Sequence, residues 1–468
     1  MRREQIQSQA QLRPNPRTRW WFSPLLWLVV LLGAHERALG QGTLLNLVTN
    51  GPRASFLNLV ILSEGYTADE LGRFETDARK VADGILSTEP FKAYRRCFNV
   101  FGIAVASLES GSDHPSKGIF RSTYFSSTYD SQGIERLITV SEDGRFQVYN
   151  MLLKHVPEYD LAIVLVNDPQ YGGSGGNFAT IVSTQTSSAE IAIHELGHSL
   201  GGLGDEYGDP YPNFPDTEEH NTTQETDRSK VKWRHWIDDS TPVPTPGTVD
   251  FEGVVGLFEG AHYHKTGWYR PKLTCRMRTL SAPFCEVCGE ALVLAMYVYV
   301  RPIVSVTPAA GTEMGATNMQ SATFSVGILP LDEAPMRLQW LVDGQPVPGA
   351  VGTVFEPRGF DFAPGSHQIT VQVLDATERV RTDNFSRLVD TRTWQLRAAQ
   401  EPVTLTARYS AGKLELSWSG TARGFVLESA AIGAEALTWT ARLTITGETG
   451  TTLTAANFGE LFRLRVPR

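Results

Sequence analysis

The segment 194–198, with the sequence HELGH, contains the residues of this 468-residue chain that are best suited to chemistry. Positions four residues apart lie on the same face of a helix, so His194 and His198 can bind one metal ion. Glu195 lies beside them, where it can take a proton from a metal-activated water and pass it to a leaving amine. The spacing therefore predicts a zinc hydrolase with one catalytic Zn²⁺ and Glu195 as its base.

The elements around this segment are those that such a site needs. A buried strand is expected at 160–168 and an edge strand at 179–182, before the helix that carries HELGH. Glycines after His198 end that helix and let the chain turn back toward the metal. Asp205 is the predicted third ligand, and Glu206 stays open as the alternative.

Charge that develops on a substrate carbonyl needs a nearby donor or cation. Tyr263 is the first candidate, followed by Tyr207, His264 and Tyr269. His235 lies between two tryptophans and is expected to have a structural role.

Longer segments around these residues resemble the IgA-peptidase family of secreted zinc metallopeptidases, which is related to the metzincins. The resemblance is carried by HELGHSLGGLGDEY (194–207), LNLVILSEGY (57–66), VKWRHWID (231–238), FEGAHYHKTGWYRP (258–271) and CRMRTLSAPFCEVC (275–288). It implies a metzincin-like domain of the α/β (α+β) class, with Asp205 as a metal ligand and Met277 in a methionine turn beneath the metal. One departure is that the usual metzincin spacing would place the third ligand at Gly204, which has no side chain.

The N-terminal segment has the pattern of a secretory signal peptide. An apolar run from Pro24 to Ala34 follows scattered arginines, and a small-x-small pattern at 38–40 precedes Gln41. The run is too short for a spanning helix. We therefore expect removal of residues 1–40, a secreted protein that is extracellular or periplasmic, and no stable membrane span.

The overall charge argues against a nucleic-acid partner. The formal net charge is −9 at pH 7, and no basic stripe or tail occurs in the sequence. Binding to a phosphate backbone depends on such basic residues.

The chain has four cysteines, Cys97, Cys275, Cys285 and Cys288. In an exported protein they predict two disulfides, with three possible connectivities. The alternative is a structural metal held by Cys275, Cys285 and Cys288, for which the sequence shows no fourth ligand nearby.

The predicted domain order is a catalytic domain followed by two β modules. The catalytic domain covers 41–301 and ends in an apolar helix from Glu286 to Val300. Alternating apolar residues and regular turns then predict an Ig-like β-sandwich at 302–399, and a small fibronectin-like β module at 400–468. These modules could contact glycans or a cell surface, or act only as spacers.

These observations predict a secreted zinc endopeptidase that cleaves protein or peptide substrates by Glu195-assisted attack of a zinc-bound water. Two alternatives stay open. One is an amidase that acts on cell-wall peptides with the same metal chemistry. The other is a catalytically silent surface-binding protein that retains its zinc site. No residue specifies immunoglobulin A as the substrate.

Overall fold

The computed structural model describes most of the chain after the predicted signal peptide. The described residues are 40–175, 179–211, 214–315, 322–332, 336–358, 360, 362, 365–398, 404–410, 413–418, 425–431, 440–444, 450–454 and 460–465. All but the last residue of the predicted signal peptide lie outside this part. The chain divides into two compact units, the first formed by residues 1–300, 331–333 and 378–382 and the second by the rest. None of the helices within the described ranges has the length and apolar character needed to cross a membrane.

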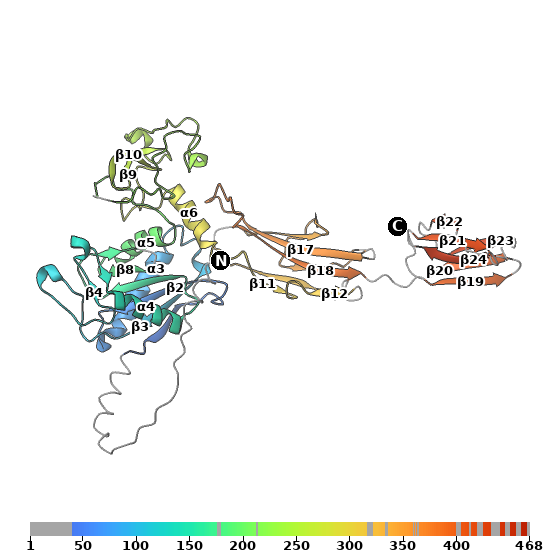
Figure 1. The fold of residues 1–468 in the computed structure, drawn as a ribbon, viewed down its shortest axis with the longest axis horizontal. Coiled ribbons are helices and arrows are strands. Elements are labelled where there is room, and N and C mark those ends of the chain that lie inside the picture. The colour runs from blue at the N-terminus through green and yellow to red at the C-terminus, as the bar shows by residue number, and fades with distance from the viewer. Residues whose placement is uncertain are drawn as a thin grey trace, which may run out of the picture. The chain divides into compact units, whose positions relative to one another are not determined.

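A six-stranded sheet forms the centre of the first unit (Figure 1). Its strands in spatial order are β1 (Thr43–Val48), β3 (Phe98–Ala104), β2 (Leu57–Glu64), β6 (Leu161–Val166), β8 (Thr180–Ser183) and β7 (Gly173–Ser174). The four central strands are parallel, and β1 and β7 are antiparallel to their neighbours. Every residue of β2, β3 and β6 is buried, as expected for parallel strands covered on both faces.

The buried strand predicted at 160–168 is confirmed by β6. The strand predicted at 179–182 also exists as β8, but its predicted position at the sheet edge is wrong. Part of the glycine-rich segment before it folds back as β7 and pairs antiparallel with β8. The edge of the sheet is therefore β7.

Helices cover both faces of this sheet. On one face, Val148, Met151 and Leu152 of α4 (Glu142–His155) share a core with the strand residues Val60 and Val164. On the other face, α3 (Leu71–Leu86) and α5 (Ser188–Ser199) pack against each other (Figure 1). The helices approach closely at Gly84, where an added Cβ would lie 2.5 Å from the Cβ of Ala189.

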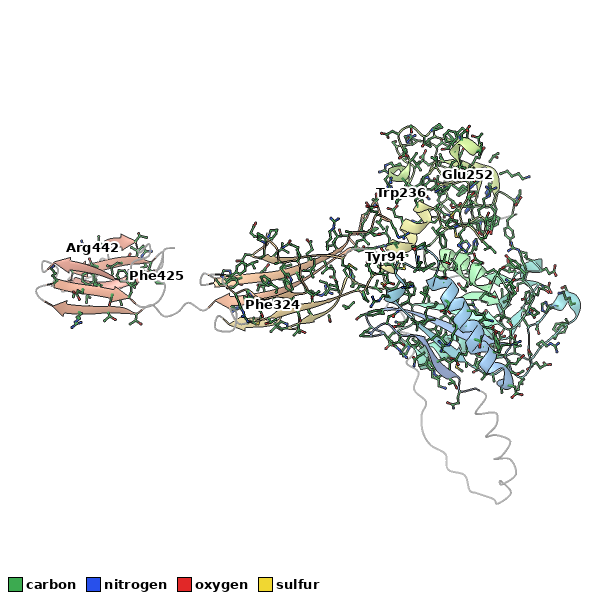
Figure 2. All side chains as sticks on the ribbon, turned by 180° about the vertical axis from the view of Figure 1, so that it is seen from behind. Tyr94, Trp236, Glu252, Phe324, Phe425 and Arg442 are labelled. Atoms are coloured by element: carbon green, nitrogen blue, oxygen red, sulfur yellow. The ribbon has the colours of Figure 1, made fainter. Side chains whose placement is uncertain are left out.

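Most of the chain between α5 and the end of the first unit is irregular. It contains a hairpin of β9 (Phe258–Ala261) and β10 (His264–Arg270), and then α6 (Glu286–Met296). The predicted extension of α6 to Val300 is wrong, because residues 297–299 form turns. β-Branched residues at 298 and 300 weaken a helix there. The ring of Tyr297 packs edge-on against Tyr94, labelled in Figure 2, with 6.0 Å between ring centroids.

The second unit consists of β-strands, as its sequence predicts. Its first part has two sheets, with the strand orders β11 (Ile303–Thr307), β13 (Phe324–Ile328), β16 (Val354–Phe355) and β12 (Glu313–Gly315), β18 (Val389–Ala398), β17 (Gly365–Asp375), β14 (Met336–Val342), β15 (Gln345–Pro346). Phe324, labelled in Figure 2, shares one core with Trp340 and Trp394 of the other sheet, so the two sheets form a sandwich. The predicted turn at Asp343 and Gly344 is confirmed, with φ of 50° and 76° in a hairpin between β14 and β15.

The last part of the chain repeats this arrangement on a smaller scale. Two three-stranded sheets have the orders β19 (Leu405–Ser410), β20 (Lys413–Trp418), β23 (Gly450–Thr454) and β22 (Thr440–Thr444), β21 (Val426–Ala431), β24 (Glu460–Arg465). Leu416, Trp418 and Leu427 form the core shared by the two sheets.

Gly84→Ala should destabilise the first unit, because the new methyl group would overlap Ala189 at the α3–α5 contact. Overpacking of this kind costs about 1–3 kcal/mol. Gly72→Ala is the matched control, since it lies in the same helix and its Cβ would meet no atom within 4 Å. The control should be neutral or stabilising by about 0.5–1 kcal/mol. Thermal unfolding followed by tryptophan fluorescence compares the two, and equal stability would contradict the close helix contact.

Candidate active site

The imidazole rings of His194 and His198 are oriented by backbone carbonyl groups. Nδ1 of His194 lies 3.0 Å from the carbonyl oxygen of Arg276, and Nδ1 of His198 lies 2.7 Å from that of Leu203. Each Nδ1–H donates to its carbonyl, which fixes the tautomer and leaves Nε2 able to bind a metal. The two Nε2 atoms are 3.2 Å apart. The helix spacing thus brings both rings to one point.

Asp205 completes a triangle of donor atoms. Its Oδ1 lies 3.1 Å from Nε2 of His194 and 3.4 Å from Nε2 of His198. Tetrahedral zinc has bonds of about 2.0–2.1 Å to nitrogen and oxygen, which places its ligand atoms about 3.3–3.4 Å from one another. The three residues, hereafter the His–His–Asp site, therefore fit a single Zn²⁺.

Glu206, the alternative third ligand, points away from the histidines. Its carboxylate lies instead among the sulfur atoms of Cys275, Cys285 and Cys288. The usual metzincin position, Gly204, has no side chain, and a Cβ there would lie 2.4 Å from Oε2 of Glu219, which would have to move. The structure therefore brings Asp205, and not its neighbours, to the histidines.

The predicted disulfides are wrong. All four cysteines are described and buried, and none forms a disulfide. The Sγ atoms of Cys275 and Cys288 are 3.6 Å apart, whereas a disulfide bond measures about 2.05 Å. Three of the thiols gather around a carboxylate, which is an arrangement for metal ligands rather than for a cross-link.

Tyr263 is held against Asp205 by a strained turn. His262 and Tyr263 form the two-residue turn between β9 and β10, with φ of 51° and 60°. A non-glycine residue in this region costs of order 1–3 kcal/mol. The N–H of His262 donates to the carbonyl of Asp205 (3.0 Å), and the N–H of Tyr263 to that of Tyr207 (2.8 Å). In this position the Tyr263 hydroxyl donates to Oδ2 of Asp205.

The other candidates for charge stabilisation lie in different surroundings. Tyr207 lines the cleft, and its ring centroid is 6.2 Å from that of His194. Burial raises the pKa of Tyr207 and of Tyr263, so both hydroxyls stay protonated and can donate. Neither His264 nor Tyr269 is among the described residues that line the cleft. His235 lies 2.7 Å from Oε2 of Glu290, in agreement with a structural role.

Glu195 projects into the cleft beside the His–His–Asp site. Burial raises the pKa of its carboxyl group, while the charges of His198 and His194 oppose this shift. A Cβ at Gly175 would lie 2.2 Å from Oε2 of Glu195. The glycine therefore leaves the space that the carboxylate occupies.

The electrostatics of the His–His–Asp site favour a positive charge. Burial would lower the pKa of His198, but the hydrogen bond and the charge of Asp205 raise it to about 9. Burial would raise the pKa of Asp205, but hydrogen bonds with His194 and His198 hold it well below its usual range. A bound cation would supply the charge that these groups favour.

Met277 lies beneath α5. Its side chain is fully buried. A Cβ at Gly197, between the two histidines, would lie 2.6 Å from the Met277 sulfur. The sulfur therefore packs directly under the helix turn that carries the histidines.

The cleft in front of these residues has a volume of about 480 Å³. One wall is the edge strand β7 with Gly175, and other walls include residues that the sequence analysis did not select, namely Arg136, Tyr171, Tyr211, Phe214 and Leu280. Burial raises the pKa of Glu195, Tyr207 and Tyr263, and the charge of Arg136 opposes that rise, so Arg136 acts on the reactive end of the cleft. No motif marks these residues, because loops distant in sequence bring them together.

Residues 45–251 and 247–296 match the family model described as IgA Peptidase M64. The two matches together span residues 45–296, more than half of the 468-residue chain. The chain belongs to the IgA Peptidase M64 family. This confirms the family resemblance, and it makes the M64 chain a peptidase with protein or peptide substrates. M64 peptidases are metallopeptidases, which agrees with the donor triangle of the His–His–Asp site.

Other comparisons add little to this assignment. No curated protein matches the M64 chain. A solved chaperone–tip adhesin complex of CFA/I fimbriae biogenesis has 12% identity and a TM-score of 0.14, and the match covers 35% of this chain and 98% of that one. The FN1–FN3 domains of chicken CNTN1 have 12% identity and a TM-score of 0.12, with 36% and 67% covered. Similarity at this level supports no conclusion about the fold.

Tyr263→Phe should weaken metal binding, because Asp205 loses the hydroxyl that orients its carboxylate. Loss of such an outer partner typically costs about 10–100-fold in metal affinity or activity. Competition with a chromogenic chelator measures the affinity. Tyr269→Phe is the matched control on the same hairpin and should leave it unchanged. Equal affinities in both variants would contradict the positioning role of Tyr263.

Proposed function

We propose that the M64 peptidase is a secreted zinc endopeptidase in which His194, His198 and Asp205 bind the catalytic ion. The main support is the donor triangle, with distances of 3.1–3.4 Å, at the base of a cleft that also contains Glu195. When bound there, Zn²⁺ would polarise the scissile carbonyl and lower the pKa of a water molecule. Secretion is proposed from the N-terminal signal pattern alone.

Glu195 has the position of a general base that later acts as an acid. It accepts a proton from the attacking water and delivers that proton to the leaving amine. Gly175 keeps the space for the carboxylate open.

The edge strand gives the cleft a way to hold an extended peptide. β7 pairs with β8 on one side, and on the other Gly173 pairs with the segment 136–137, where its N–H donates to the carbonyl of Arg136 (3.2 Å). Gly173, Ser174 and Gly175 line the cleft, and a substrate backbone would add as a further strand beyond Gly173, at Ser174 and Gly175. Tyr211 and Phe214 provide apolar surface for substrate side chains in the same cleft. This arrangement suits cleavage within a chain.

The negative charge that develops on the carbonyl oxygen needs a donor. The Tyr207 hydroxyl is our first candidate, since no hydrogen bond to another described residue occupies it. Tyr263 is the second, because it would have to release Asp205 before it could reach the substrate. Arg136 contributes a positive charge to the same region.

Glu195→Gln should abolish cleavage and leave zinc bound, because it keeps the shape of the side chain but cannot accept the proton. The expected loss in kcat is about 10²–10⁴-fold. Cleavage of a mixed protein pool is followed by mass spectrometry of the fragment ends, and zinc by elemental analysis. Glu142→Gln, at the exposed start of α4, is the control and should retain full activity.

Fragments produced by cleavage at internal peptide bonds, rather than by removal of terminal residues, would identify an endopeptidase. A wild-type protein that binds zinc but cleaves no protein would contradict the proposal. Cleavage of peptidoglycan peptides by that protein would then favour the amidase, and no cleavage of either substrate would favour a binding protein.

A further inference from the structure

A second group of potential metal ligands lies inside the first unit, outside the His–His–Asp site. It consists of Glu206, Cys275, Cys285 and Cys288, hereafter the cysteine cluster. One ligand atom from each residue lies within 4.8 Å of all the others. Cys285 is 4% exposed and the other three residues are 0% exposed. The cluster is therefore closed to solvent.

The spacing within the cysteine cluster fits one tetrahedral ion. Zn–S bonds of about 2.3 Å place two sulfur ligands about 3.8 Å apart, and a sulfur and an oxygen ligand about 3.5 Å apart. The Sγ atoms of Cys275 and Cys288 are 3.6 Å apart, and Sγ of Cys288 lies 3.5 Å from Oε1 of Glu206. These are separations of ligands around a common centre.

The hydrogen bonding of the Glu206 carboxylate gives independent evidence that a cation belongs beside it. Its Oε1 accepts a hydrogen bond from Nδ2 of Asn221 (2.9 Å), but its buried Oε2 has no hydrogen-bond partner among the described residues. A buried carboxylate without a partner is costly. Arg270 interacts electrostatically with Glu206 and Cys275, yet it carries one positive charge beside one carboxylate and three thiols. A divalent cation would satisfy both the oxygen and the charge.

The local structure also favours thiolates at this place. Cys285 is the N-cap residue of α6, and Cys288 lies in its first turn. The positive end of a helix stabilises anionic sulfur. The N–H of Cys285 further donates to Sγ of Cys275, with 3.4 Å between the two atoms.

We propose that the cysteine cluster binds a second, structural Zn²⁺. Three thiolates with one carboxylate in a tetrahedral arrangement select zinc over magnesium or calcium. Four protein ligands leave no open position for a water or a substrate, so this ion has no direct part in hydrolysis.

The second ion would stabilise the segments that hold the catalytic ligands. Glu206 follows Asp205 directly, and its N–H donates to the carbonyl of Met277 (2.9 Å). Cys275 precedes Arg276, whose carbonyl orients His194. One ion in the cysteine cluster thus connects the segment of the third catalytic ligand with the segment beneath the histidines.

The decisive experiment uses the full chain with the double substitution His194→Ala and His198→Ala, which removes the catalytic ligands and keeps the cysteine cluster. Elemental analysis after dialysis should give two zinc ions per chain for the wild type and one for the variant. X-ray absorption at the zinc edge of the variant should show sulfur neighbours at about 2.3 Å. A variant without zinc, or zinc without sulfur neighbours, would overturn the proposal.

Cysteine substitutions provide the second test. Cys288→Ser should reduce the wild-type count by at least one zinc, and Cys97→Ser, outside the cluster, should leave it at two. If Cys288→Ser fails to fold, the oxidation state of the four cysteines in the wild type provides the test instead. After denaturation in chelator and alkylation without a reductant, all four should be modified. A disulfide between any two of them would refute the metal site. None of these measurements depends on peptidase activity, so the two proposals can fail separately.

Discussion

Two backbone carbonyl groups, those of Arg276 and Leu203, determine which nitrogen atoms His194 and His198 present to the cleft. An α-helix can align two imidazoles, but it cannot choose their tautomers or stop their rings from rotating. That control comes from irregular segments packed around α5. Met277 packs beneath Gly197, and this packing places the carbonyl of the preceding residue, Arg276, within hydrogen-bond distance of Nδ1 of His194. The cleft therefore depends on how well these loops are held, more than on the helix itself.

Much of the candidate site could be predicted because it is local in sequence. The spacing of His194 and His198 needs only one helix, and α5 provides it. Asp205 follows His198 by seven residues, so a short segment of chain is enough to bring its carboxylate back to the two histidines. The strands β2 and β6 are recognisable because their residues are apolar without interruption, which is typical of a sheet covered on both faces.

The parts that the sequence did not reveal depend on contacts between distant segments. Whether Asp205 or Glu206 faces the histidines is decided by the cysteines that surround Glu206. The disulfide prediction rested on the number of cysteines and on the expected export, and neither shows that Glu206, from a segment far upstream, lies among three of the cysteines. Arg136 reaches the cleft from a loop without regular structure. A short strand of glycine and serine, β7, carries no apolar pattern, so the sheet edge could not be placed in advance.

The strained turn at His262 and Tyr263 sets a limit on engineering. Both positions have the left-handed backbone that asparagine and glycine adopt at much lower cost. A laboratory selection for heat resistance would therefore favour glycine at position 263, whereas His262 is fully buried and stacks on Trp268. Such a variant would relieve the strained backbone and lose the hydroxyl that orients Asp205. The hairpin thus places stability and activity in opposition at a single residue.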